Sequence, residues 1–162
     1  MTGIEEKNSD ISAAISGLAR SRGLTVAVAE SLTGGALSAE LAAAESSSEW
    51  YAGAVVAYQS RTKYDVLGVA EGAPVITESA VLQMARGVRE LLRTDAAVAV
   101  SGAGGPEGQD GQPAGTVWIA VSVGEDTRTE KHLFDGSPEE ILARTTTRAL
   151  TLLRETIKRG SA

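Results

Sequence analysis

The chain has 162 residues, 43% of them hydrophobic, which fits one domain with a sizeable core over residues 1–162, and nothing in the composition suggests a fibre, a disordered tail or a repeat array. Its 21 acidic and 15 basic residues give a formal net charge of −6, which argues against a nucleic-acid-binding protein but leaves room for a small anionic ligand. The absence of cysteine excludes a disulfide scaffold, a cysteine-ligated metal and a thiol nucleophile.

The first half of the chain alternates between helical and strand patterns. Apolar residues at Ile11, Ile15 and Leu18 recur at the spacing of one helix face, and Gly23 can end that helix. The patterns predict, in order, a helix at 4–22, a strand at 25–29, a helix from 33–35 to about 44, a strand at 50–58 and a helix at 60–66 capped by Ser60.

The second half of the chain begins with a loop and a strongly periodic helix. The expected elements are a loop at 68–76, a helix at 78–93 capped by Thr77, a strand at 96–100, a glycine-rich loop at 101–112 and a hairpin of strands 115–123 and 127–134. Ser137, Pro138 and Glu140 form a capping-box start for a last helix that runs to about residue 158.

Strands that alternate with helices, followed by a hairpin and a last helix, predict a three-layer α/β/α fold with a mixed sheet. Three unusual turns follow the apolar runs that end at Ala29, Ala57 and Val100. If these strands are parallel neighbours, the three turns meet at one edge of the sheet. Ligands of α/β proteins usually bind at such an edge.

Ser31 lies two residues after the first predicted strand and precedes the helix that opens at Thr33, Gly34 and Gly35. A hydroxyl in this position lies next to helix N–H groups that have no acceptor, and these groups can stabilise a developing anion. We therefore predict that Ser31 is a nucleophile. The alternative is that Ser31 only caps the helix.

Two residues near the second turn are candidates for handling the proton of Ser31. The single histidine, His132, lies in a strand pattern and is expected to be structural, so neither a histidine base nor a histidine metal site is expected. Desolvation and the positive charge of Arg61 can favour neutral Lys63. Lys63 could then accept the proton directly or through Tyr58. The alternative is a solvated lysine and a tyrosine at the rim of the core.

The third turn is rich in glycine. Gly102, Gly104 and Gly105 allow the backbone to approach a ligand closely and to hold an oxyanion or a phosphate through N–H groups. The segment lacks the ending of a P-loop and breaks the dinucleotide-binding pattern, so a tight connection is the alternative. On the last helix, Arg144 and Arg148 are expected on a solvated face.

Three ordered motifs stand out when the turns are taken together. They read VAESLTGG at 28–35, VAY at 56–58 with Lys63 and LGV at 67–69, and SGAGGP at 101–106 leading to PAGTV at 113–117. From about residue 11 to residue 158, the chain resembles the CinA C-terminal domain family, also called nicotinamide-nucleotide amidohydrolase.

The resemblance implies an activity and a set of site residues. The implied reaction is hydrolysis of the carboxamide of nicotinamide mononucleotide to nicotinate mononucleotide and ammonia, without a metal or other cofactor. Ser31 would be the nucleophile, with Tyr58 and Lys63 as the proton-handling pair. The implied substrate-binding backbone includes Thr33, Gly34, Gly35, Gly104 and Gly105.

Two departures from the family pattern concern the substrate. Where many members have Phe-x-Gly-Asp-Arg-x-x-Ile-Arg, residues 134–142 read FDGSPEEIL, which places Pro138 and Leu142 where two arginines are expected. The usual Gly-x-Ala-Gly-Pro reads GAGGP at 102–106. If a lost arginine held the nucleotide phosphate, binding would weaken by about 1.5–3 kcal/mol, and Arg144 is the candidate to compensate.

Other functions stay open: a nucleotide- or partner-binding module that has lost activity, and amide hydrolysis of a different small substrate. Longer family members carry a molybdopterin-binding-like domain before this unit, which is not expected here. The apolar runs are too short to cross a membrane and residues 1–10 lack signal-peptide features, so we expect a cytoplasmic protein without membrane contacts. A small domain with a sheet edge to cover is expected to form a homo-oligomer.

Overall fold

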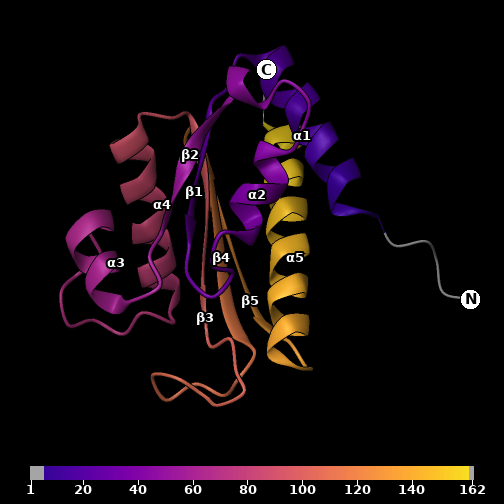
Figure 1. Ribbon diagram of the computed structural model, residues 1–162. Coiled ribbons are helices and arrows are strands. Elements are labelled where there is room, and N and C mark those ends of the chain that lie inside the picture. Colours follow the sequence, from indigo (N-terminus) through magenta and orange to yellow (C-terminus); the bar gives the residue numbers. More distant parts are fainter. Residues whose placement is uncertain (1–5, 161–162) are drawn as a thin grey trace, which may run out of the picture.

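The computed structural model describes residues 6–160, in which a five-stranded sheet lies between two layers of helices (Figure 1). The strands are β1 (Val26–Glu30), β2 (Tyr51–Val56), β3 (Ala96–Gly102), β4 (Thr116–Val123) and β5 (Asp126–Leu133). The helices are α1 (Asn8–Arg22), α2 (Ala36–Ala42), α3 (Ser60–Leu67), α4 (Glu78–Leu92) and α5 (Pro138–Arg159), with a short 3-10 turn η1 (Ser47–Glu49). The predicted three-layer α/β/α fold with a mixed sheet is confirmed.

The sheet has the strand order β2-β1-β3-β4-β5. β1 pairs in parallel with both β2 and β3, whereas β4 is antiparallel to β3 and to β5. Helices α1, α2 and α5 cover one face of the sheet, and α3 and α4 cover the other (Figure 1). The three parallel strands therefore end at a common edge.

The alternation of residues along the central strands explains how the two faces pack. In β3, Val98 and Val100 belong to the core on the α5 side, whereas Ala97 and Ala99 belong to the core on the α4 side. Successive side chains of a strand point to opposite faces, so valine fills one layer and the small alanine side chains allow α4 to lie close to the other.

Close packing also joins α3 to α4, and it holds the helix that carries Lys63. A side-chain carbon added at Gly87 of α4 would lie 1.9 Å from the carbonyl oxygen of Leu67, at the end of α3. Only glycine allows the two backbones to approach this closely. Gly87 therefore fixes where α3 lies.

Several boundaries differ from the expected ones. The first helix begins at Asn8, and residues 4 and 5 of its predicted range lie outside the described residues. The second strand ends at Val56, which leaves Tyr58 in the connection that follows. The predicted Ser60 cap is wrong, because Ser60 is the first helical residue and Gln59 is the N-cap, without a side-chain bond. Such boundaries depend on the hydrogen bonds of the last turn, which periodicity does not reveal.

The other caps are confirmed. The hydroxyl of Thr77 accepts a hydrogen bond from the N–H of Ala80, and Ser137 and Glu140 form the predicted capping box of α5. Among residues 6–160, no helix combines the length and the apolar character needed to cross a bilayer.

Candidate functional site at the carboxyl edge of the sheet

The three turns identified from the sequence lie at one edge of the sheet, as predicted. β1 pairs in parallel with β2 on one side and with β3 on the other, so the segments after Glu30, Val56 and Gly102 are neighbours. A side-chain carbon added at Gly104 would lie 3.5 Å from Leu32 Cβ. The third turn thus packs closely against the first.

Ser31 begins a tight turn between β1 and α2. Ser31 is only 6% exposed, and its carbonyl oxygen accepts a hydrogen bond from the N–H of Gly34 at 3.1 Å. Ser31 does not cap α2, because the N-cap position is occupied by Gly35. The alternative interpretation of Ser31 as a helix cap is therefore wrong.

The N–H groups at the start of α2 are not free, which corrects a second expectation. They are bonded to the carboxylate of Glu30, a fully buried residue at the end of β1. Its hydrogen-bond donors are the N–H groups of Gly35 (3.2 Å), Leu37 (3.0 Å) and Ser38 (2.8 Å) and the hydroxyl of Thr33. Glu30 thus satisfies donors that a helix start leaves open.

The two N–H groups directly after Ser31 find no acceptor among residues 6–160. Between residues 6 and 160, the backbone N–H groups of Leu32 and Thr33 donate no hydrogen bond, whereas that of Ala36 donates to the Thr33 carbonyl at 3.0 Å. Leu32 and Thr33 follow Ser31 directly in the chain. Donors immediately after a nucleophile are suited to stabilise an oxyanion.

Lys63 of α3 is buried, with 1% exposed, although it is a charged residue. Its Nζ donates a hydrogen bond to the carbonyl oxygen of Ala57 at 2.7 Å, and the Ala57 N–H donates to the Glu30 carbonyl at 2.7 Å. One residue therefore links the amine of Lys63 to the end of β1, directly before Ser31. The alternative of a solvated lysine is wrong.

Burial is the main cause of the altered acidity of Lys63. Desolvation disfavours the ammonium form and lowers the pKa of Lys63 from 10.5 to about 8, although the negative charge of Asp110 partly opposes this. The expected help from Arg61 is absent, because Arg61 is mostly exposed and pairs with Asp65 at 3.6 Å. The charge that acts on Lys63 is thus the negative charge of Asp110, which lies in the loop after β3.

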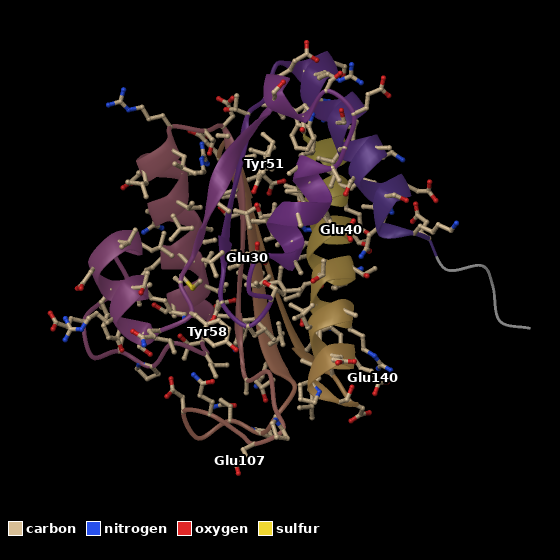
Figure 2. All side chains as sticks on the ribbon, in the orientation of Figure 1. Glu30, Glu40, Tyr51, Tyr58, Glu107 and Glu140 are labelled. Atoms are coloured by element: carbon tan, nitrogen blue, oxygen red, sulfur yellow. The ribbon has the colours of Figure 1, made fainter. Side chains whose placement is uncertain are left out.

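Tyr58 differs from the other two candidates in its exposure. The residue is 67% exposed and lies at the end of the sheet where Glu107 of the third loop also lies (Figure 2). Among residues 6–160, no hydrogen bond joins Ser31, Tyr58 and Lys63 to one another. The structure brings all three to one edge of the sheet but does not connect them into a bonded relay.

The third turn contacts the start of α5. A side-chain carbon added at Gly105 would lie 3.5 Å from Ile141 Cδ1 and 3.8 Å from Pro138 Cγ, so a residue that replaces an expected arginine borders this turn. Arg144, one turn further along α5, is exposed and lines a groove with Ile11 of α1.

The remaining candidate residues on β5 and α5 form a structural cluster. His132 lies 2.8 Å from the Glu130 carboxylate and stacks on Phe134, as expected for a structural histidine. Arg148 forms two hydrogen bonds to Glu130 at 2.7 and 2.6 Å, which lowers the pKa of Glu130 to about 2. Arg148 therefore does not lie on a purely solvated face, because it holds α5 against β5.

Two residues of the site were not identified from the sequence. Glu30 carried a signal, since a carboxylate that ends an apolar strand and precedes a Thr-Gly-Gly turn must find partners when buried. Asp110 carried none, because its effect on Lys63 depends on where a loop much further along the chain lies; there its carboxylate accepts a hydrogen bond from the N–H of Val75 at 3.3 Å.

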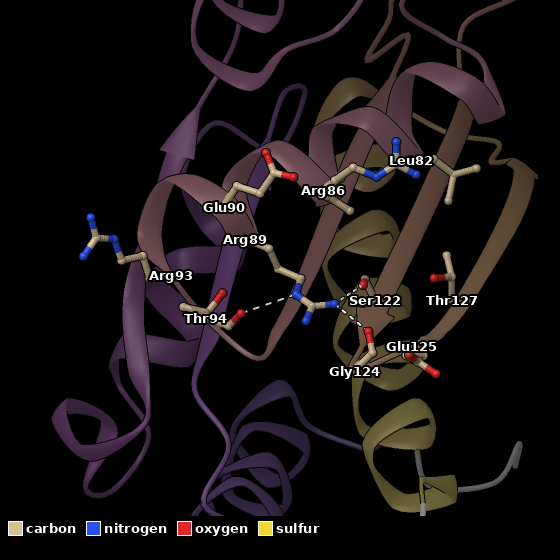
Figure 3. Close-up of a pocket in the computed structure, with 11 residues that line it drawn as sticks. Leu82, Arg86, Arg89, Glu90, Arg93, Thr94, Ser122, Gly124, Glu125 and Thr127 are labelled. Carbon is tan, nitrogen blue, oxygen red and sulfur yellow. Dashed lines mark hydrogen bonds between the residues drawn. The ribbon is translucent and has the colours of Figure 1, made fainter.

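A different groove, of about 770 Å³, lies at the opposite edge of the sheet (Figure 3). It is centred on Arg89 of α4, which donates to the carbonyl oxygens of Thr94 (3.3 Å) and Gly124 (2.7 Å) and to the hydroxyl of Ser122 (2.7 Å). No candidate residue of the sequence analysis lines it. Within residues 6–160, no three acidic or histidine side chains are grouped as a metal site would require.

Known proteins resemble this chain in sequence and in fold. Residues 8–157 match the model of the CinA C-terminal domain. A CinA-like protein of Salinibacter ruber is 40% identical over 120 residues, which cover 71% of this chain and 29% of that protein. The chain spans about a third of the length of such curated relatives.

Two further relatives match over nearly their whole length. The nicotinamide-nucleotide amidohydrolase PncC of Enterobacter agglomerans is 35% identical, covering 95% of this chain and 98% of that protein. The crystal structure of the competence damage-inducible protein A of Klebsiella pneumoniae superimposes with a TM-score of 0.92 at 34% identity, over 96% of this chain and 100% of that one. The chain belongs to the CinA C-terminal domain family.

Proposed function

We propose that this chain hydrolyses the carboxamide of nicotinamide mononucleotide, which yields nicotinate mononucleotide and ammonia. The relative named nicotinamide-nucleotide amidohydrolase supports this activity, because it matches nearly end to end at 35% identity. The observation that carries the proposal is the buried amine of Lys63. This amine is bonded to the carbonyl oxygen of Ala57, and the N–H of Ala57 is bonded to the carbonyl oxygen of Glu30, the residue before Ser31.

The chemistry that we propose needs a base that is neutral near physiological pH. With its pKa lowered to about 8 by desolvation, Lys63 provides a neutral amine in a useful fraction of molecules. Ser31 Oγ forms a bond to the amide carbon, and its proton passes to Lys63 Nζ, directly or through the Tyr58 hydroxyl. The carbonyl electron pair moves onto the oxygen.

The intermediate then collapses and the enzyme is restored. The carbon–nitrogen bond breaks as Lys63 returns the proton to the leaving nitrogen, and ammonia departs. Water attacks the resulting ester on Ser31 and gives a proton to Lys63, which returns it to Ser31 Oγ as the ester bond breaks. The product carries a carboxylate where the substrate carried an amide.

The substrate site is proposed to lie between the first and third turns, along the backbone of residues 33–35 and of Gly104 and Gly105. We assign the phosphate of the nucleotide to Arg144, because it lies one helical turn beyond Ile141, whose side chain borders Gly105. On this assignment the Arg144→Ala variant raises KM about tenfold with little change in kcat, since a charge-assisted contact is lost.

The test measures ammonia released from nicotinamide mononucleotide by the wild-type chain and by the Ser31→Ala variant. We expect turnover by the wild type and a loss of roughly 10³-fold or more in the variant, with unchanged thermal unfolding. A panel of other small carboxamides in the same assay identifies a different amide substrate. Wild-type protein that releases no ammonia from nicotinamide mononucleotide at high concentration contradicts the proposal.

A second function is favoured by one specific observation. Pro138, and not an arginine, borders the third turn at Gly105, so the phosphate end of the site differs from the family pattern. A binding module that has lost activity would show tight binding of the nucleotide by calorimetry together with no ammonia release.

A further inference from the structure

The carboxylate of Glu30 connects the strand before Ser31 to the helix after it. Glu30 is 0% exposed, and its Oε1 accepts hydrogen bonds from the N–H groups of Gly35 (3.2 Å) and Leu37 (3.0 Å) and from the Thr33 hydroxyl. Its Oε2 accepts from the N–H of Ser38 at 2.8 Å. Both oxygens are therefore used on the segment that follows the nucleophile.

The charge of Glu30 is compensated by these donors alone. Among residues 6–160, no lysine, arginine or histidine forms an ion pair with it. Hydrogen bonds to an ionised acceptor are shorter and stronger than neutral ones. A glutamine in the same place would direct an amide N–H₂ group at one set of donors and would break the arrangement.

The bonds of Glu30 decide which donors of the turn stay available. The N–H groups of Gly34 and Gly35 are taken by the Ser31 carbonyl and by Glu30. Those of Leu32 and Thr33 have no acceptor among residues 6–160. The turn is thus held at both ends while the two donors next to the nucleophile remain open.

We propose that Glu30 is a positioning residue for chemistry at Ser31. Its carboxylate fixes the turn 31–35 so that the N–H groups of Leu32 and Thr33 receive the negative charge that forms on the carbonyl oxygen when Ser31 attacks. Glu30 itself touches no reacting atom. The inference rests on the proposed function, in which Ser31 is the nucleophile.

The Glu30→Gln variant tests the proposal, with Asp95→Asn as the matched control. At the opposite end of β1, the Asp95 carboxylate accepts from the N–H of Thr25 (2.9 Å) and from its hydroxyl (3.0 Å), so it makes the same kinds of bond. We expect kcat per folded molecule to fall roughly 10- to 100-fold in Glu30→Gln, with KM changed by less than about threefold. The Asp95→Asn variant keeps both within about twofold.

A second readout does not depend on the substrate. A fluorophosphonate bonds to an activated serine hydroxyl with loss of fluoride, and mass spectrometry locates the adduct on Ser31. We expect the labelling rate to fall in parallel with kcat in Glu30→Gln, because the same donors stabilise the charged oxygen on phosphorus. If Glu30→Gln does not fold, Thr33→Val removes one bond to the carboxylate and lowers both rates roughly threefold or more.

The outcomes separate the two proposals. Unchanged kcat and labelling per folded molecule would mean that Glu30 only stabilises the helix, and this would overturn the inference. Labelling of wild-type Ser31 without ammonia release refutes the proposed substrate but leaves Glu30→Gln to be judged by its labelling rate. A wild-type chain that shows neither reaction overturns both proposals.

Discussion

The two edges of the sheet hold their polar groups in opposite ways. At the edge formed by the amino end of β3 and the β4–β5 turn, the guanidinium of Arg89 lies in a groove of about 770 Å³ and is bonded to Thr94, Ser122 and Gly124 (Figure 3). At the carboxyl edge, the amine of Lys63 is buried against a single carbonyl, and the N–H groups of Leu32 and Thr33 have no acceptor among residues 6–160.

The large groove and the polar groups without protein partners therefore lie at different edges of the sheet. Arg89 donates to protein acceptors on three sides, so it acts as a structural clamp between α4 and the hairpin. The carboxyl edge instead holds the desolvated amine of Lys63 and two N–H groups without an acceptor among residues 6–160, and such groups cost stability unless a ligand or a reaction uses them. Four predictions test whether the two edges differ in this way.

The largest effect is expected from Lys63→Met, which removes the proposed base without adding charge. Ammonia release should fall roughly 10²- to 10⁴-fold, because a positioned base contributes about that much to proton transfer. The measurement is kcat at saturating nicotinamide mononucleotide, with folded fraction followed by circular dichroism. Full turnover by this variant would show that Lys63 is not the base.

The next effect concerns stability as a function of pH. The pKa of Lys63 in the folded chain is about 8 and its usual value is 10.5. Below pH 8 Lys63 is protonated in both the folded and the unfolded chain, so the cost of burying the ammonium is fully present. Between about pH 8 and 10.5 only the unfolded chain holds it, so stability rises with pH, by ~3 kcal/mol in total.

Urea unfolding of the wild type and of Lys63→Met at pH 7.5 and pH 10 measures this difference. The wild type should gain stability relative to the variant as the pH rises, because only the wild type loses the buried charge. A constant difference between the two proteins would show that Lys63 is not desolvated in solution.

A smaller effect on stability is expected from Arg89→Met at the opposite edge. Loss of the bonds to Thr94, Ser122 and Gly124 should lower the free energy of unfolding by about 2 kcal/mol, in the range for hydrogen bonds to a charged group. kcat should stay within about twofold of the wild type. A large loss of turnover at unchanged stability would reverse the roles assigned to the two edges.

The smallest effect is expected from Asp110→Asn. The Asp110 carboxylate raises the pKa of Lys63, so its removal should lower that pKa further. The acid limb of the pH profile of kcat/KM then moves to lower pH, because a larger fraction of Lys63 is neutral at any given pH. Glu107→Gln, on the same loop, is the control and should leave the limb in place.

Much of the fold was predictable because its signals are local. The order of strands and helices follows from apolar spacing, and the caps at Thr77 and Ser137 follow from short motifs, all of which the structure confirms. The Ser60 cap failed because the chain enters that helix one residue earlier, with Gln59 as the N-cap.

The sequence predicted three residues of the candidate site but not how they are arranged. Ser31, Tyr58 and Lys63 were identified from strand ends and from the family motifs, and the structure places them at one edge. Their differing exposure, 67% for Tyr58 against 1% for Lys63, was not predictable, because it depends on how α3 packs against α4 and on the loop after β3.

The sequence by itself determined the mixed α/β architecture, the position of Ser31 at the end of a buried strand, and the family, because periodicity, turn residues and motifs are properties of short segments. The tertiary structure alone decided which groups are paired and which are not. It assigned the helix donors to Glu30, left the N–H groups of Leu32 and Thr33 without an acceptor among residues 6–160, and desolvated Lys63 near Asp110. These properties depend on long-range packing, which brings together residues that no local pattern connects.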